Sequence, residues 1–418
     1  MTPGISLYRF ASGGLDPFVP WAMARRSARG KEDPDRLNER LARDLPPRPK
    51  GQLIWFHGAS LGECKLLMML SKALETEWQD AHCLFTFQTL AAADVLQRDI
   101  GDIALLQLAP VDTPRAAARF IDHWTPDLCI FAEGEIWPNL LNSARSAGCA
   151  TALVNARMTE KSIKGWKRWP TSAERIFKGF QAILAADRRT GDALSEITGR
   201  VVACPGNLKL STLKVASPGV RPDPPELWDE GVSVLLGASI HQSDISRLID
   251  ALKHLPAQTR LILAPRHMKS VSAICDGAEA AGYSWARRTE TPKISGSTKI
   301  YIADTFGELD TWYQYADHIY LGGAIEPGIG GHNPLEPLRY GKCVMTGPHM
   351  TNFADLAHDL KEIGALKIVQ TPHDIAQATE APAHLSQEVM ARLLDMAEAP
   401  MAATLAALRP LLPAKAET

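Results

Sequence analysis

Short apolar runs alternate with amphipathic stretches from Gln52 onward, and this alternation occurs in two successive blocks. A short apolar run suits a strand buried on both faces, and the stretch between two such runs suits a covering helix. The pattern therefore predicts mainly parallel sheets with helices on both faces. The strands predicted in the first block are Leu53–His57, Cys83–Phe87, Ala104–Leu108, Leu128–Ala132, Ala150–Asn155, Ala182–Ala186 and Val201–Cys204. Those predicted in the second block are Val232–Gly237, Leu261–Ala264, Ile300–Ala303, Ile319–Leu321, Val344–Met345 and Leu366–Val369.

A proline-rich segment, Ser217–Pro225, separates the two blocks, and prolines disfavour both helices and sheet ladders. A chain of 418 residues is also too long for one ordinary core. We therefore expect an α/β fold with two Rossmann-like domains and a cleft between them. The expected divisions are an N-terminal membrane-interface segment at 1–30, a Rossmann-like domain at 31–212, a linker at 213–229, a second Rossmann-like domain at 230–395 and a C-terminal helix at 396–418. Predicted helices include Cys64–Glu77, Pro114–Trp124, Glu174–Phe180 and the alanine- and leucine-rich stretch Ser386–Leu412.

The charge and hydropathy of the chain restrict its partners. The formal net charge is −2, so no global basic field attracts nucleic acid, and we expect no nucleic-acid partner. No apolar run approaches the roughly 20 residues of a membrane-spanning helix. Residues 7–31 nevertheless combine aromatic and basic side chains, which suits a segment lying in a membrane interface, although a tail packed on its own domain is an equal alternative. Lys161 and Lys164 lie among tryptophans in a second such segment, where a solvated face is the commoner meaning.

A glycine-rich loop from Gly322 to Glu336 is the clearest candidate ligand site. Its glycines allow positive φ and close approach of the backbone to a ligand. The residues Asn333, Pro334 and Leu335 then predict a helix start, with Asn333 as N-cap, Pro334 at the first position and Glu336 at the third. Free N–H groups there suit a phosphate, and Glu336 could either close a capping box or bind ribose hydroxyls. The loop matches neither GxGxxG nor the P-loop pattern.

Ionisable residues follow several predicted strands, where open α/β sheets bind ligands. Glu63 can act as a general base on an acceptor hydroxyl, or it can simply complement the helix dipole. Glu133 and Glu135 can form an acid/base or orienting pair, or one of them can cap the next helix. Asp33–Asp35 has the DxD form of a metal site but is better explained as a helix start, so we expect no metal and no cofactor. Cations that could neutralise an anionic donor are Lys209, Arg266, Arg157 and His267.

Taken in order, these motifs resemble the 3-deoxy-D-manno-octulosonate (Kdo) transferases, a family with the two-domain GT-B fold. The resemblance covers most of the chain, and its most specific segments are Ala59–Glu63, Glu133–Asn139, Gly206–Lys209 and Gly330–Glu336. It implies transfer of Kdo from CMP-Kdo to a hydroxyl of lipid IVA, the tetraacylated lipid A precursor, by a metal-independent, inverting reaction. It also implies that the reaction takes place at the cytoplasmic face of the inner membrane. Relatives commonly begin with a longer apolar anchor, which Gly13, Gly14, Pro17 and Pro20 interrupt here, so peripheral contact is expected.

The resemblance also implies roles for individual residues. Glu63 corresponds to the general base, and Glu133 and Lys209 correspond to residues that assist the transition state. The first domain then binds the acceptor and the second the nucleotide sugar. The residues implied to hold CMP are Pro265, Arg266, Phe306, Gly307, Glu308, Asn333, Pro334, Leu335 and Glu336. Further candidates for contacting the acceptor or neutralising charge are Ser60, Arg157, His267, Lys161 and Lys164.

Two other functions remain open from the residues. Another GT-B enzyme could use a different nucleotide sugar, such as a UDP-hexose. A non-catalytic two-domain protein could close on a ligand without turning it over. Turnover with CMP-Kdo rather than UDP-sugars distinguishes the first alternative, and the effect of Glu63→Gln distinguishes the second.

Overall fold

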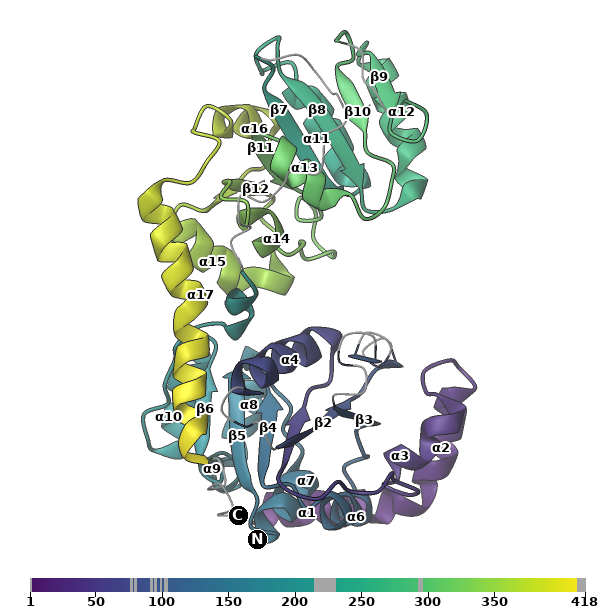
Figure 1. Cartoon of the computed structure of the whole chain (residues 1–418), viewed down its shortest axis with the longest axis vertical. Coiled ribbons are helices and arrows are strands. Elements are labelled where there is room, and N and C mark those ends of the chain that lie inside the picture. Colours follow the sequence, from purple (N-terminus) through teal and green to yellow (C-terminus); the bar gives the residue numbers. More distant parts are fainter. Residues whose placement is uncertain are drawn as a thin grey trace. The chain divides into compact units, whose positions relative to one another are not determined.

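The structure is a computed structural model that describes residues 2–75, 78, 81–90, 93, 96, 97, 100, 104–213, 231–291 and 296–411. The chain divides into two compact units (Figure 1). Unit 1 comprises Met1–Thr212 and Glu398–Thr418, and unit 2 comprises Leu213–Ala397. Apart from Leu213, the predicted linker lies outside the described residues.

Unit 1 contains a parallel sheet whose described strands lie in the order β3-β2-β1-β4-β5-β6, as in Rossmann folds. The end of β1, at His57, lies opposite Thr86 of β2 and Phe131 of β4. The carboxyl ends of these strands therefore meet at one edge of the sheet, and so do the loops that follow them. The strands are β1 (Leu53–His57), β2 (His82–Phe87), β3 (Leu105–Leu108), β4 (Leu128–Ala132), β5 (Ala150–Ala156) and β6 (Ala182–Ala185).

The prediction of a strand at Val201–Cys204 is wrong, whereas the other strands predicted in the first block are confirmed. Within this segment, the described pairing is an isolated bridge between Ala203 and Leu184. Val201 is 94% exposed, so the apolar side chain that suggested a strand is not buried by any neighbour. Pro205 follows at once and has no N–H to extend a ladder.

Helices cover both faces of this sheet because successive side chains of each buried strand point to opposite sides. On one face, Trp55 packs against Phe120 with ring centroids 4.8 Å apart. On the other face, Phe56 stacks on Phe85. The helices of this region are η2 (Pro34–Arg36), α3 (Leu37–Arg40), α4 (Leu61–Glu75), α6 (Pro114–Trp124), α7 (Pro138–Ser146), α8 (Glu160–Lys167), α9 (Pro170–Lys178), α10 (Arg188–Thr198) and η4 (Leu208–Thr212). At η2, the Asp33 side chain accepts from the Asp35 N–H, so this motif is a helix start as predicted.

The N-terminal segment folds into α1 (Pro3–Leu15), η1 (Asp16–Phe18) and α2 (Val19–Ser27). One side of α1 packs on unit 1, where the Tyr8 hydroxyl donates to Asp112 Oδ2 at 2.9 Å. Large apolar side chains elsewhere on these helices are exposed, including Phe10 of α1 at 83% and Trp21 of α2 at 64%. Among the described helices, none is both long and apolar enough to cross a membrane. The segment thus packs on its own domain while presenting an apolar outer surface.

Unit 2 contains a second parallel sheet, with its described strands in the order β13-β12-β11-β7-β8-β10-β9. The strands predicted in the second block are all present, and these two parallel-sheet units confirm the predicted α/β fold class. Strand β9 was missed because it is a short edge strand with no apolar run. The strands are β7 (Val234–Ile240), β8 (Arg260–Pro265), β9 (Trp285–Arg287), β10 (Ile300–Ile302), β11 (His318–Leu321), β12 (Val344–Thr346) and β13 (Leu366–Ile368).

The remaining helices surround this sheet and close the chain. They are α11 (Gln242–Ala251), η5 (Met268–Ser270), α12 (Val271–Ala280), α13 (Leu309–Tyr315), α14 (Leu335–Leu338), η6 (Thr351–Phe353), α15 (Ala354–Glu362), α16 (Pro372–Ala378), α17 (Gln387–Leu408) and η7 (Arg409–Leu411). The predicted C-terminal helix is confirmed by α17 and η7, with Leu412 outside the described residues. The last turns of α17 belong to unit 1, where Leu408 is fully buried in the core.

Candidate active site

Glu63 is held at the start of α4 by its own loop. Its carboxylate accepts from the Ala59 N–H at 2.6 Å and from the Ser60 hydroxyl at 2.8 Å. A Cβ at Gly58 would lie 3.0 Å from that of Glu63, so a glycine relieves crowding at this sharp turn. Burial raises the pKa of Glu63, the two hydrogen bonds lower it, and the neighbouring carboxylates raise it again, with a net rise. A carboxylate with a raised pKa is better matched to proton abstraction near neutral pH.

Lys209 and Glu133 form an ion pair beside this loop. Lys209 Nζ lies 2.5 Å from Glu133 Oε1, and also 3.9 Å from where a Cβ on Gly62 would stand. Asn155 joins the two segments, because its side chain donates to Glu133 Oε1 at 3.3 Å and accepts from the Leu208 N–H at 2.8 Å. Glu133 and Asn155 have φ of 53° and 51°, a left-handed conformation that is uncommon outside glycine and is often found at functional sites.

Glu135 lies at the end of a series of buried polar contacts. Trp55 Nε1 donates to Thr86 Oγ1 at 2.7 Å, and Thr86 Oγ1 lies 2.8 Å from His57 Nδ1. If the threonine hydroxyl donates to Nδ1, the proton of the imidazole is on Nε2, which lies 3.4 Å from Glu135 Oε2. The Trp137 indole donates to the same oxygen at 2.8 Å. Burial would raise the pKa of Glu135, but these donors outweigh it and the pKa is lowered.

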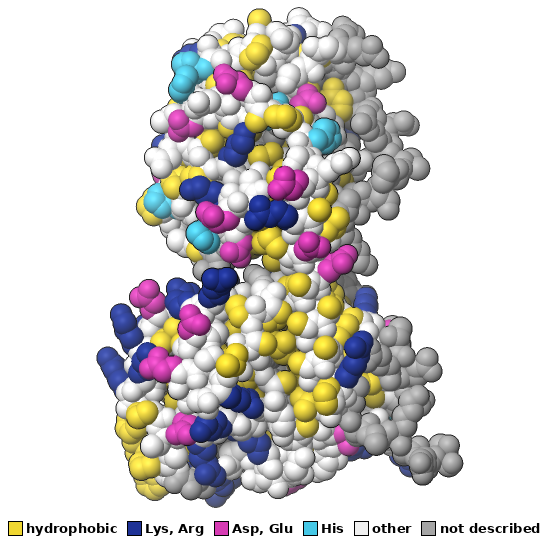
Figure 2. All heavy atoms as spheres, turned by 90° about the vertical axis from the view of Figure 1, so that its left-hand side faces the viewer, with side chains coloured by type: hydrophobic (Ala, Val, Ile, Leu, Met, Phe, Trp, Pro, Cys, Tyr) yellow, Lys and Arg dark blue, Asp and Glu magenta, His cyan; other side chains and the backbone are white. Residues whose placement is uncertain are grey.

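The other residues predicted in unit 1 are placed less centrally. Ser60 is exposed apart from its bond to Glu63, and Arg157 follows β5, where its N–H donates to the Glu133 carbonyl at 3.4 Å. Lys161 and Lys164 lie on the exposed side of α8, where Lys164 Nζ lies 3.9 Å from Glu160 Oε2. Figure 2 shows many Lys and Arg side chains gathered on one face of unit 1.

The glycine-rich loop of unit 2 is fixed by a buried aspartate, Asp244. Its Oδ2 accepts from the N–H groups of His241 at 2.8 Å and Gly323 at 3.0 Å. Its Oδ1 accepts from the Tyr320 hydroxyl at 2.7 Å. A Cβ on Gly322 would lie 2.7 Å from the Ile240 Cα, so the loop passes directly against the end of β7. Asp244 is not among the residues predicted from the sequence, because it lies far from the loop along the chain.

The end of this loop differs from the prediction. Asn333 Oδ1 accepts from the Leu335 N–H at 3.1 Å, but the helix α14 begins at Leu335 with Pro334 at its N-cap. Asn333 is therefore not the N-cap, Glu336 is not the third helical residue, and no capping box forms. The reason is that the asparagine side chain closes a local turn instead. Because α14 has only the four residues Leu335–Leu338, its dipole gives a phosphate little support.

Histidines and Arg266 gather where β7, β8 and β11 end. His241 Nε2 lies 2.9 Å from His332 Nε2, and the two rings stack with centroids 5.1 Å apart. His267 meets the His241 ring edge-on at 5.7 Å. Burial, reinforced by His241 and Arg266, lowers the pKa of His332 to about 4. The His332 ring is therefore neutral near pH 7, and the permanent positive charge at this edge comes from Arg266.

The segment after β10 contains the other predicted donor-binding residues. Phe306 is 77% exposed, and Gly307 has a φ of 85°. Glu308 forms an ion pair with Arg288 at 3.0 Å, which lowers the pKa of Glu308. Because β10 pairs with β8, which ends at Pro265, this segment follows the strand adjacent to Arg266.

The two units thus offer different chemistry. Unit 1 combines a carboxylate of raised pKa with an ion pair between a lysine and a carboxylate. Unit 2 combines a tight glycine loop, an arginine and an exposed phenylalanine at its strand ends. No group of three or more His, Cys, Asp or Glu side chains that could hold a metal occurs among the described residues.

A solved structure shares this architecture. A glycosyltransferase from Rickettsia africae matches with a TM-score of 0.56 and 12% sequence identity, covering 87% of this chain and 99% of that chain. At this identity the likeness concerns the fold alone. Together with the two parallel-sheet units, it places the chain in the class of proteins with the GT-B glycosyltransferase fold, as predicted.

The sequence comparisons are more specific than the fold. Residues 35–212 match the family described as 3-deoxy-D-manno-octulosonic-acid transferase (kdotransferase). A 3-deoxy-D-manno-octulosonic acid transferase from Rickettsia bellii is 29% identical over 379 residues, which cover 90% of each protein. The probable mitochondrial 3-deoxy-D-manno-octulosonic acid transferase of Arabidopsis thaliana is 30% identical over 378 residues, covering 87% of this chain and 84% of that protein. The chain belongs to the 3-deoxy-D-manno-octulosonic acid transferase family, and it is an enzyme of that family, as the resemblance implied.

Proposed function

We propose that this enzyme transfers Kdo from CMP-Kdo to a hydroxyl of lipid IVA in lipopolysaccharide assembly. The reaction is inverting and needs no metal ion, and it takes place at the cytoplasmic face of the inner membrane. Glu63 is the general base, and Glu133 and Lys209 stabilise the transition state. The residues that hold CMP are Pro265, Arg266, Phe306, Gly307, Glu308, Asn333, Pro334, Leu335 and Glu336.

The environment of Glu63 carries this proposal. Its carboxylate is buried, its pKa is raised, and hydrogen bonds from Ala59 and Ser60 fix its position. A glutamate that merely complemented a helix dipole would not need this burial and fixed geometry. These properties favour proton abstraction, which a displacement by an acceptor hydroxyl requires.

In the proposed reaction, Glu63 takes the proton of the acceptor hydroxyl while the oxygen of that hydroxyl attacks the anomeric carbon of Kdo. The bond from that carbon to the CMP phosphate oxygen breaks, and CMP leaves with the electron pair. Attack opposite the leaving group inverts the configuration. Positive charge stabilises the anions of this reaction, and we assign it to Lys209 beside the general base and to Arg266 beside the nucleotide. Ser60 orients Glu63, and Arg157 and His267 are further candidates for charge neutralisation.

Attachment to the membrane surface follows from the acceptor, which is a lipid with phosphates. The exposed aromatic side chains of α1 and α2 and the basic residues Arg25, Arg29 and Lys31 support a peripheral contact. Lys161 and Lys164 on α8 add exposed positive charge that can attract acidic head groups.

The test is incubation of the purified chain with CMP-Kdo and lipid IVA in vesicles, followed by mass spectrometry of the lipid. We expect a product heavier by Kdo, with undiminished yield in a chelator and with inverted anomeric configuration by NMR. Glu63→Gln should retain CMP affinity and lose transfer. Turnover with UDP-hexoses but not with CMP-Kdo would instead assign another GT-B reaction, and full activity of Glu63→Gln would remove Glu63 from the mechanism.

A further inference from the structure

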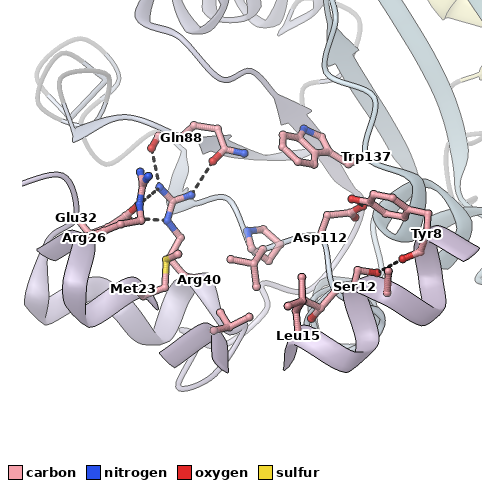
Figure 3. Close-up of a pocket in the computed structure, with 15 residues that line it drawn as sticks. Tyr8, Ser12, Leu15, Met23, Arg26, Glu32, Arg40, Gln88, Asp112 and Trp137 are labelled. Carbon is pink, nitrogen blue, oxygen red and sulfur yellow. Dashed lines mark hydrogen bonds and ion pairs between the residues drawn. The ribbon is translucent and has the colours of Figure 1, made fainter. Parts of the chain in front are cut away.

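A cavity of about 500 Å³ lies under the N-terminal helices of unit 1 (Figure 3). Ala11 and Leu15 of α1 and Val19 and Met23 of α2 line one side of it, and Trp137 lines another. Its volume falls within the roughly 300–1,000 Å³ of typical small-molecule sites. The cavity is therefore large enough for a ligand, and the segment that lines it is the one with the exposed apolar surface.

A second cavity of about 310 Å³ shares two of these walls. Tyr8 and Trp137 line both cavities, and the second is otherwise bounded by aromatic and aliphatic side chains such as Trp166, Trp169 and Ile176. Trp169 is 51% exposed. Apolar space thus adjoins Tyr8 and Trp137 in both cavities.

The charged groups in the larger cavity already have partners within the protein. Arg40 donates to Glu32 at 2.9 Å, to the Gln88 side chain at 3.0 Å and to the Ala109 carbonyl at 2.9 Å. Asp112 accepts from Tyr8 and from two backbone N–H groups at the start of α7. A sugar or nucleotide would have to displace these bonds, whereas a hydrocarbon leaves them intact. The chemistry of the cavity therefore suits an apolar ligand.

The cavity is connected to the candidate catalytic groups through one side chain. Trp137 lines it and donates its indole N–H to Glu135, and Glu135 is close enough to raise the pKa of Glu63. On the other side, α2 carries Trp21 with the guanidinium of Arg25 over its ring, 5.6 Å from the centroid. An apolar chain entering here would connect a surface suited to acidic lipid head groups with the loop that carries the carboxylates.

We propose that this cavity holds one acyl chain of the acceptor lipid while the sugar of that lipid is at the active site. This inference rests on the proposed function, since it assigns a subsite to the proposed acceptor. Each buried methylene contributes about fourfold in affinity. A larger side chain that displaces two methylenes should therefore weaken acceptor binding by about fifteenfold.

Photo-crosslinking tests the subsite directly. The probe is lipid IVA with a diazirine in one acyl chain, presented in detergent to the full chain without CMP-Kdo. We expect labelled peptides within residues 8–23 and 110–137, located by mass spectrometry. Ala11→Phe and Val19→Trp should each reduce that labelling about tenfold or more. Ala24→Phe adds the phenyl ring of Ala11→Phe at a position on α2 outside the cavity lining, and this variant should be labelled as strongly as the original protein. Thermal unfolding confirms that the variants are folded.

The outcomes separate this proposal from the proposed function. Labelling confined to other surfaces, or unaffected by both filling variants, overturns the subsite even if Kdo is transferred. Displacement of the probe by an excess of phosphatidylethanolamine would show that the cavity holds a bilayer lipid, and this also overturns the proposal. Specific labelling without any turnover of CMP-Kdo would refute the proposed transfer but support the acyl-chain subsite.

Discussion

Replacing Asp244 with alanine leaves three donors without their acceptor: the N–H groups of His241 and Gly323 and the hydroxyl of Tyr320. A buried donor left unpaired costs about 1–3 kcal/mol. Gly323 and Tyr320 are buried, whereas water can reach the partly exposed His241. At about 2 kcal/mol for each of the two buried donors, Asp244→Ala should lower the free energy of unfolding by about 4 kcal/mol.

Asp244→Asn is the matched control because it keeps the size of the side chain. The amide oxygen can still accept from Gly323, and the amide nitrogen can donate to the Tyr320 oxygen. The variant loses the charge of the carboxylate, so we expect a cost of only about 1–2 kcal/mol. The difference between alanine and asparagine is thus the specific signature of the hydrogen bonds.

Urea unfolding gives the total cost, and hydrogen exchange of peptides around His241 and Gly323 reports the loop itself. The local measurement is needed because a chain of two units need not unfold in one transition. Affinity for CMP should fall more for Asp244→Ala than for Asp244→Asn, in parallel with the loss of hydrogen-exchange protection in the loop. Equal losses for the two variants, or an alanine variant within about 0.5 kcal/mol of the original protein, would falsify the role of Asp244 as the clamp of the loop.

Three further predictions concern ionisable groups. Burial raises the pKa of Glu63, so ionisation of this carboxyl lowers the stability of the folded protein as the pH rises above 4.5. Glu63→Gln should therefore melt no lower than the original protein at pH 8, and the difference in melting temperature should shrink toward pH 4. The same substitution should lower turnover about 10²–10⁴-fold. A clearly lower melting temperature at pH 8 would contradict this. Lys209→Met should reduce turnover about 10²-fold but change the free energy of unfolding by about 1 kcal/mol or less, because the ion pair with Glu133 is partly exposed. Kinetics and urea unfolding of the same variant test this. A loss of stability with nearly unchanged turnover would show that the ion pair is purely structural. The pKa of His332 lies at about 4, below its usual 6.5, so the stability present above pH 6.5 should decline by at most about 3 kcal/mol as the pH falls toward 4. His332→Gln should flatten this decline in denaturation at pH 7 and pH 4.5, and an equal decline in both proteins would refute it.

Most strands of both sheets could be predicted because they are short apolar runs, which are typical of strands buried on both faces. The same signal failed at Val201, whose apolar side chain is exposed, and at β9, whose residues are only partly buried. The glycine-rich loop was also visible in the sequence, since positive φ restricts positions such as Gly323 to few residue types.

The connections between site residues could not be predicted in this way. The clamp joins Asp244 to Gly323 across 79 positions, and Asn155 joins Glu133, 22 positions away, to the Leu208 backbone, 53 positions away. These contacts depend on strand order, which the alternation of helices and strands does not specify. The sequence does indicate where such contacts form, because a polar residue at the end of a buried strand, such as His57, marks the edge of the sheet at which the site lies.

The C-terminal turns of α17 complete the core of unit 1, although 185 residues of unit 2 separate them from Thr212. During synthesis, the first sheet therefore emerges from the ribosome without the helix that covers part of it. At roughly 5–20 residues per second, the wait lasts on the order of 10–40 s. Nascent chains stalled before Glu398 would expose the apolar surface that Leu408 contacts, and transiently exposed apolar surface makes an incomplete chain prone to aggregate.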